Sequence, residues 1–147
     1  WGLGKRSAGV IVVNYRGEPN TMEIIKSHSK ITPVMQGGRL KVQIQVWVET
    51  NLGELQVEQP ITPELLKVLK KRQNEVIRQE LTATIMKSQA MKADILDLGG
   101  AVHARYPKVW RTLEPKWADY YSQLPVEVLV DSLVSDIGTT NHGHAGR

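Results

Sequence analysis

The feature that most constrains the fold is the alternation of apolar and polar side chains in RLKVQIQVWVET, residues 39–50. Successive side chains of a β-strand point to opposite faces of the sheet. The segment is therefore predicted to be a strand with one face in the core and the other in water. Trp47 interrupts the polar face, which favours cross-strand packing at that position, with a partner-binding surface as the alternative.

A long helix is predicted after this strand. Thr62, Pro63 and Glu64 supply an N-cap, a proline at the first helical position and an early carboxylate. If the helix continues to about Lys92, it is about 45 Å long at 1.5 Å per residue. The apolar residues that recur at three-, four- and seven-residue intervals and define its predicted buried stripe are Leu65, Leu66, Leu69, Val76, Ile77, Leu81, Ala83, Ile85 and Met91.

Three further strands are predicted on either side of this core pattern. Residues 9–15 are β-branched and continuous, which is typical of a strand buried on both faces or at a sheet centre. Residues 21–30 are predicted to pair with them in antiparallel fashion through a short turn, and Thr32-Pro33 and Gly37-Gly38 interrupt the segment between residues 30 and 39. Residues 126–137 alternate again and predict a closing strand.

Shorter helices are predicted between the long helix and the closing strand. Asp94 is a candidate cap for a helix through Leu98, and Gly99-Gly100 is a candidate kink, close-packing point or terminator. Pro107 is expected to open the next helix. Pro115 is expected to kink or break that helix at Glu114.

This order of elements predicts an α+β fold. We expect a twisted, largely antiparallel sheet of about four to five strands, with one long and two shorter helices packed against it. A chain of 147 residues is in the usual range for one domain. We therefore expect a single domain over residues 1–138 and a flexible tail at residues 139–147, which has no apolar anchor.

The composition excludes some classes of site and partner. The chain has no cysteine, so it has no disulfide, thiolate zinc site or cysteine nucleophile. No apolar run is long enough to span a bilayer, and a start at Trp1 suggests a fragment cut from a longer chain. The net charge is +4, but the basic residues are interleaved with acidic ones. That spacing favours a solvated, mildly basic surface and no nucleic-acid partner.

Catalytic and metal-binding patterns are weak. His142 and His144 form a pair, but a zinc site needs at least three protein ligands. His28 and His103 are far apart in sequence, and no Gly-x-Ser-x-Gly or phosphate-loop motif is present. The carboxylates at 94 and 97 are explained by a helix N-terminus. We therefore predict a protein that is not an enzyme and has no cofactor or metal.

The residues between the long helix and the closing strand resemble those of a known family. A glutamine at the helix end, an Asp-aliphatic-aliphatic-x-aliphatic-Gly run, a Pro-x-x-Trp and a second tryptophan, in that order, are similar to the C-terminal signature of spore germinant receptor C subunits. Gly100 and Pro115 depart from that pattern. The residues that carry the resemblance are Gln89, Asp94, Gly99, Pro107, Trp110 and Trp117.

The resemblance implies a non-enzymatic, lipid-anchored subunit on the extracytoplasmic side of the spore inner membrane. It implies a scaffold or interaction role in triggering germination, with a membrane A subunit and a transporter-like B subunit as partners. The lipid anchor would lie upstream of Trp1, and neither catalytic residues nor a small-molecule ligand are assigned. A small peptide- or nucleic-acid-binding module is the alternative. The candidate partner surface consists of Trp47, Lys71, Arg78, His103 and Arg105.

Overall fold

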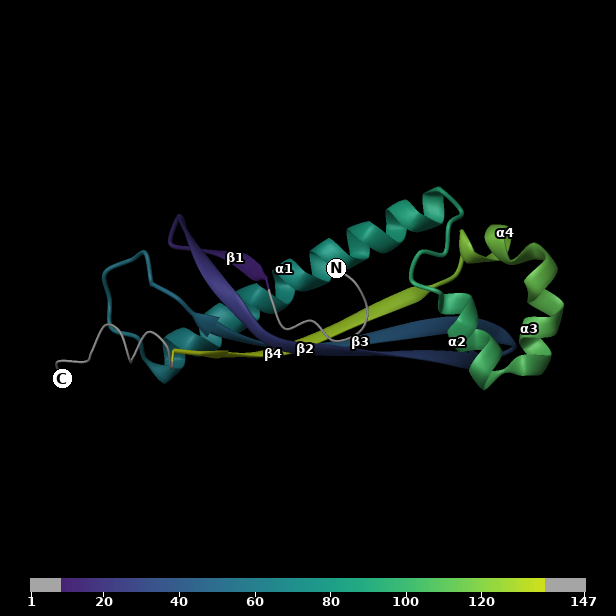
Figure 1. Cartoon of the computed structure of the whole chain (residues 1–147), viewed down its shortest axis with the longest axis horizontal. Helices are drawn as coiled ribbons and strands as arrows, with labels where there is room; N and C mark the ends of the chain where they lie inside the picture. The colour runs from purple at the N-terminus through teal and green to yellow at the C-terminus, as the bar shows by residue number, and fades with distance from the viewer. Residues whose placement is uncertain (1–8, 137–147) are drawn as a thin grey trace. The chain divides into compact units, whose positions relative to one another are not determined.

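A computed structural model describes residues 9–136 of the chain, so the predicted tail at 139–147, with His142 and His144, lies outside the described residues. The four strands form one sheet in the order β1-β2-β3-β4. Strands and helices occur together in one sheet-based fold, so the predicted α+β class is confirmed. In chain order the elements are β1 (Val10–Tyr15), β2 (Glu18–Gln36), β3 (Arg39–Leu52), α1 (Pro63–Ala90), α2 (Leu98–Arg105), α3 (Pro107–Leu113), the 3₁₀ helix η1 (Glu114–Lys116), α4 (Trp117–Tyr121) and β4 (Val126–Ser135) (Figure 1).

The first three strands are joined by tight turns. β1 pairs with β2 in antiparallel fashion, from Val10 opposite Glu23 to Tyr15 opposite Glu18. The turn between β2 and β3 is Gly37-Gly38, with φ angles of 59° and 77°. Two consecutive positive φ angles are those of the two-residue hairpin turn that matches strand twist, and glycine adopts them without steric cost.

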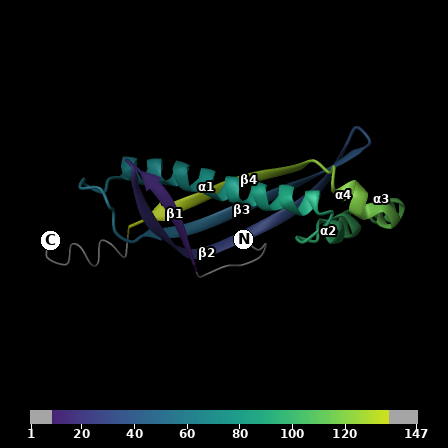
Figure 2. The ribbon, with the colours of Figure 1, turned by 90° about the horizontal axis from the view of Figure 1, so that it is seen from above.

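The last strand pairs differently, because β4 lies parallel to β3. Thr50 Oγ1 lies 3.5 Å from the carbonyl oxygen of Leu133, and one residue further along β3, Asn51 Oδ1 accepts from Ser135 Oγ. The contacts therefore advance in the same direction along both strands, which lie side by side in Figure 2. A parallel pair needs a long crossover connection, and the segment that contains α1 provides it.

The prediction that β1 is buried on both faces was wrong. Ile11 and Val13 are buried, but the alternate side chains Val10 and Val12 are 60% and 50% exposed. β1 is the first strand of the sheet and has only β2 as a neighbour. Its β-branched residues therefore occupy an edge strand, with one face in the core and one in water.

The predicted end of the second strand was also wrong, since β2 continues past Thr32-Pro33 to Gln36. The ladder with β1 covers only residues 18–23 of β2. Beyond it, β2 has β3 on one side only. A proline has no N–H to donate, and an unpaired strand edge tolerates it.

The buried stripe of α1 has a stricter spacing than predicted. Every fourth residue from Leu65 is buried, and the series includes a glutamine, Gln73, which is fully buried. Met91 lies after the last helical residue and is 66% exposed, while Val76 is half-buried and Ala83 is exposed. The buried stripe consists of Leu65, Leu69, Gln73, Ile77, Leu81 and Ile85.

The described residues group into two compact units. Unit 1 consists of Ser29–Gln45 and Gln79–Leu129, and unit 2 of residues 9–28, Val46–Arg78 and residues 130–136. The single domain expected over residues 1–138 stays a prediction. The core of unit 1 includes Leu40, Val42, Ile44, Leu81, Ile85, Leu98, Val102, Leu113, Tyr121 and Leu124, and that of unit 2 includes Ile11, Val13, Met22, Ile24, Val46, Val48, Leu52, Leu65, Leu69, Ile77 and Val134.

A polar network lies inside the core of unit 2. Gln73 Oε1 accepts a hydrogen bond from Thr50 Oγ1 at 2.7 Å, and Gln73 Nε2 donates to Ser132 Oγ at 2.9 Å. Ser132 Oγ in turn donates to Asn74 Oδ1 at 2.5 Å. The network joins α1 to β3 and β4, and its buried polar atoms are paired, as the interior of a protein requires.

Candidate functional site

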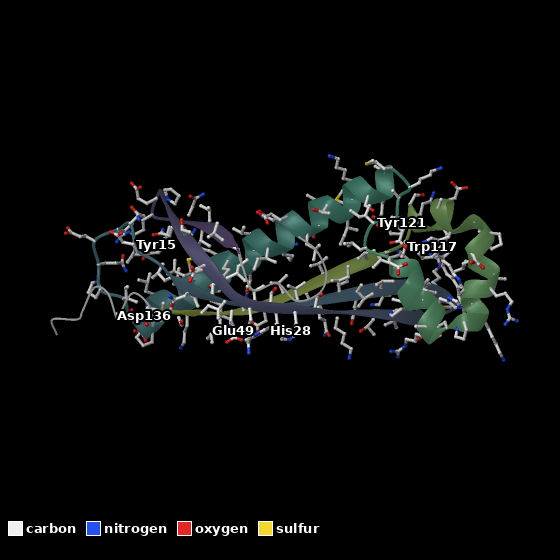
Figure 3. All side chains as sticks on the ribbon, in the orientation of Figure 1. Tyr15, His28, Glu49, Trp117, Tyr121 and Asp136 are labelled. Carbon is white, nitrogen blue, oxygen red and sulfur yellow. The ribbon has the colours of Figure 1, made fainter. Side chains whose placement is uncertain are left out.

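Four of the six residues that carry the family resemblance meet in unit 1 and, with Tyr121, form a cluster that we call the aromatic corner: Asp94, Gly99, Trp110, Trp117 and Tyr121. The rings of Trp117 and Tyr121 lie next to each other, with centroids 6.0 Å apart (Figure 3). Trp117 also contacts Trp110 edge to face at 5.1 Å. Such edge-on and tilted ring pairs are favoured by the quadrupoles of aromatic rings.

Asp94 connects three parts of this corner. Its Oδ1 accepts from the N–H of Leu98 at 2.8 Å. Its Oδ2 accepts from the N–H of Gly99 at 2.7 Å and from Nε1–H of Trp117 at 2.9 Å. The carboxylate therefore satisfies two free N–H groups at the start of α2, where a negative charge is also favoured by the helix dipole.

The local helix boundaries differ from the prediction. α2 begins at Leu98, with Asp97 as its N-cap at a φ of 56°, so Asp94 acts on the helix start from outside it. Gly99 and Gly100 lie in the first turn and do not end the helix. The chain turns between Ala93 and Asp97, which places the Asp94 side chain against the new helix instead of inside one.

Gly99 lies where two indole rings pack against the backbone. A Cβ atom at this position would be 2.8 Å from Trp110 Cη2 and 2.9 Å from Trp117 Nε1. Real Cβ contacts are longer than this, so a glycine is the residue that fits. Trp110 itself is half-buried.

The end of α1 is joined to the turn before β4. Gln89 Nε2 donates to the carbonyl oxygens of Tyr121 and Leu124, at 3.0 and 2.7 Å. One residue earlier, Ser88 Oγ donates to the carbonyl of Ala93 and lies 2.7 Å from the Tyr121 hydroxyl. Burial raises the pKa of the Tyr121 hydroxyl. Sequence reasoning missed Ser88, and the four-residue spacing from Trp117 was the available signal for Tyr121.

Pro107 and Pro115 act on the helices as the sequence predicts. Pro107 is the first residue of α3, and α3 ends at Leu113, before η1. Tyr106, at the junction of α2 and α3, accepts a hydrogen bond on its hydroxyl oxygen from the Met35 N–H of β2 at 3.4 Å. The guanidinium of Arg105, which also donates to this oxygen, lowers the pKa of Tyr106.

Two residues of the candidate partner surface lie beside the aromatic corner in unit 1. The imidazole of His103 is exposed and stacks on Trp110, with centroids 6.0 Å apart. Arg105 is exposed and lies over the ring of Tyr106, 5.6 Å from its centroid. Both are on α2, so the structure brings His103 and Arg105 to one short helix.

The other three residues belong to unit 2, where they do not form one patch. Trp47 Nε1 donates to Glu49, whose pKa is lowered mainly by its hydrogen bond with Lys26. Glu49 points away from α1 in Figure 3, so Trp47, two residues earlier in the strand, shares the sheet face that α1 does not cover. Lys71 and Arg78 are exposed on α1 itself, and Arg78 pairs with Glu75 at 2.5 Å.

Within residues 9–136, no group of three or more histidine or carboxylate side chains is placed to hold a metal ion. None of the helices that the structure describes has the length and apolar character needed to cross a membrane. The carboxylate of Asp94 and the indole N–H of Trp117 are both occupied by structural hydrogen bonds. The contacts of the aromatic corner join α2, α3 and α4 to one another.

Comparison with known proteins places the chain in a family. A family model described as "Spore germination B3/ GerAC like, C-terminal" matches residues 1–138. Spore germination protein B3 of Bacillus subtilis (strain 168) is 25% identical over 142 residues, which are 95% of this chain. Spore germination protein A3 of the same organism is 38% identical over 50 residues, or 33% of this chain and 13% of that protein.

A solved structure shares the fold. The crystal structure of the GerBC protein superposes with a TM-score of 0.79 at 23% identity, over 88% of this chain and 41% of that one. The chain spans 38% of the length of spore germination protein B3. The family match covers nearly the whole chain, so the chain belongs to the spore germination B3/GerAC like C-terminal family, that of the germinant receptor C subunits.

Proposed function

We propose that this chain is the C-terminal domain of a non-enzymatic subunit that acts in spore germination, and that it works by holding other receptor subunits in place. The proposal is supported by the contacts of the signature residues, which stabilise the fold. Asp94 accepts three hydrogen bonds and Gly99 packs against two indole rings, so both hold the fold. Their role supports an interaction domain with a rigid helical corner.

The partners we propose are the membrane A and B subunits of the receptor. Two curated relatives bear the names spore germination protein A3 and B3, which is consistent with a receptor assembly. In the full-length protein, a lipid anchor outside this chain would attach the subunit to the spore inner membrane, on its extracytoplasmic side. The domain itself would then contact its partners through exposed side chains.

The partner-facing surface that we favour is the exposed side of α2. His103 and Arg105 are both exposed there, and each is positioned by a ring, Trp110 and Tyr106 respectively. Side chains that are already ordered lose less conformational entropy on binding than free ones. Arginine and aromatic residues are also enriched among the residues that dominate protein interfaces.

Site-specific crosslinking in spores would test this proposal. A photo-crosslinking residue would replace Arg105 in the full-length subunit, and in a matched control it would replace Glu114, which is also exposed in unit 1. We expect crosslinks from position 105 to a membrane subunit of the receptor, and few from position 114. Both variants must first be shown to be stable and correctly localised. If position 105 then gives no crosslink to the A or B subunit, the proposed surface is contradicted.

The scaffold role has a second, functional test. The variant Arg105→Glu reverses the charge at the proposed surface, and we expect it to slow nutrient-triggered germination while the subunit still accumulates in the spore membrane. Lys108→Glu, a charge reversal on α3, is the control and should leave the rate unchanged. A normal germination rate in Arg105→Glu would contradict a contact at this position.

A further inference from the structure

An open pocket of about 570 Å³ lies in unit 1, and none of its lining residues is on α2. Arg39, at the start of β3, and Lys116, the last residue of η1, line it together with Asp119 and Tyr120 of α4. Arg39 directly follows the Gly37-Gly38 turn, and Lys116 directly follows Pro115. These two breaks in regular structure therefore position the two basic residues. No residue of this pocket has a role in the proposed interaction surface.

The charges in the pocket are not balanced. Lys92 pairs with Asp119 at 2.7 Å, and this contact holds the pKa of the Asp119 carboxyl below its usual range. Asp119 is therefore ionised at neutral pH, and its charge is matched by that of Lys92. Arg39 and Lys116 have no ion-pair or hydrogen-bond partner for their side chains among the described residues. Two unpaired positive charges therefore face the same open space.

The pocket also has an apolar wall. Its accessible apolar side chains are Pro125, which is exposed, and Tyr120, which is half-buried; Leu40 and Leu124 also line it but are only 2% and 4% exposed. The ring of Tyr120 is stacked on Trp117, with centroids 5.9 Å apart, so its position is fixed by the aromatic corner. A ligand in this pocket meets cations on one side and an apolar surface on the other.

We propose that the pocket binds a carboxylate carried on a short apolar stem. Arg39 supplies a planar fork that can donate two parallel hydrogen bonds to a carboxylate, and Lys116 supplies a second positive charge. The stem would contact Pro125 and the ring of Tyr120. This site goes beyond the proposed scaffold role and does not depend on it.

The test is a titration of the ¹⁵N-labelled chain followed by NMR. The probe is 4-methylpentanoate, which joins a carboxylate to a short branched apolar stem, and the matched control compound is its neutral amide, 4-methylpentanamide. We expect saturable shifts of the amide signals of residues 40, 120 and 124 with the acid, and much weaker effects with the amide. Equal binding of acid and amide, or no saturable shift with any acid probe, would overturn the proposal.

A second pair of probes identifies the source of the carboxylate. N-acetyl-Leu-Asp-amide carries it on a polypeptide, and N-acetyl-Leu-Asn-amide is the neutral counterpart. Tighter binding of the blocked dipeptide than of 4-methylpentanoate assigns the site to an acidic segment of a protein, and the reverse order assigns it to a small free acid. Both results support a carboxylate site.

Variants locate the binding residues. Arg39→Gln and Lys116→Gln should each weaken binding of the better acid probe about tenfold, the loss of one charge-assisted contact. Lys108→Gln removes an exposed lysine of α3 that does not line the pocket, and it should bind like the parent chain. Arg39 and Lys116 are exposed, so their replacement should leave the remaining spectrum unchanged. Undiminished binding in both variants would refute the assignment.

Discussion

The indole Nε1–H of Trp117 donates a hydrogen bond to Oδ2 of Asp94 at 2.9 Å, although the two residues are 23 positions apart in the sequence. The same oxygen accepts from the N–H of Gly99. One carboxylate thus joins the segment after α1 to the first turn of α2 and the start of α4. The signature residues Asp94, Gly99 and Trp117 therefore connect three segments of the backbone.

The variant Asp94→Asn should destabilise the chain by about 1–3 kcal/mol. An asparagine keeps one acceptor oxygen, but its amide N–H₂ would face the N–H groups that Asp94 now satisfies. The free energy of unfolding, from urea titrations followed by tryptophan fluorescence, would measure the loss.

Asp97→Asn is the matched control for that variant. Asp97 uses one oxygen to accept from the Gly100 N–H, and it has a positive φ angle that asparagine tolerates. We expect a change within about 0.5 kcal/mol. An equal loss of stability in the two variants would show that the three hydrogen bonds of Asp94 stabilise the fold no more than the single bond of Asp97 does.

Gly99→Ala should destabilise the chain by about 1–3 kcal/mol, because the added methyl group would overlap two indole rings. In an exposed helix the same change stabilises by up to about 1 kcal/mol, so the sign of the effect tests the close approach. Gly53→Ala is the control, since its Cβ would be 3.6 Å from the Thr21 oxygen, an ordinary contact. A rise in the thermal midpoint of Gly99→Ala would contradict the packing.

Gln73→Met should cost about 1–3 kcal/mol, because Thr50 and Ser132 would each lose one hydrogen-bond partner inside the core of unit 2. The double variant Gln73→Met/Thr50→Val removes one of these two hydroxyls and should recover part of that loss. The coupling free energy from the four unfolding curves measures the interaction. Strictly additive losses would show that the two side chains do not interact in solution.

The ion pair between Lys92 and Asp119 gives a pH-dependent prediction. Lys92 lowers the pKa of Asp119 in the folded state, so the contribution of the pair is present above the unfolded pKa and is lost as the pH falls through the folded pKa. We expect Lys92→Gln to raise the pKa of Asp119, as measured by carboxyl ¹³C NMR between about pH 2 and pH 6. Lys87→Gln, which removes an exposed lysine of α1, should leave it unchanged; an unaltered pKa in Lys92→Gln would disprove the contact.

The sequence allowed the elements with a regular side-chain period to be predicted. Residues 39–50 alternate strictly, and Leu40, Val42, Ile44, Val46 and Val48 are all buried in β3. Likewise, the start of α1 after Thr62 follows from local capping, and Thr62 Oγ1 accepts from the Leu65 N–H at 3.1 Å. Both features depend on residues that are close in sequence.

The errors arose where distant contacts decide the local structure. β2 extends through Pro33 because the pairing with β1 stops at residue 23, and that limit is not visible in the sequence of β2. Similarly, Gln73 is buried because Thr50 and Ser132 satisfy its amide, so a polar residue occupies the inner face of α1. The carboxylate site at Arg39 and Lys116 joins residues that no sequence motif connects.

The parallel pairing of β3 with β4 has a consequence for how the chain folds. Thr50 and Leu133, which contact each other, are 83 positions apart, and all four short helical segments lie between them. Contacts between distant residues form slowly, because the intervening chain must lose conformational freedom before the contact stabilises it. The hairpins from β1 to β3 can form as soon as their residues leave the ribosome, whereas the sheet stays incomplete until β4, almost the last described segment, has been synthesised.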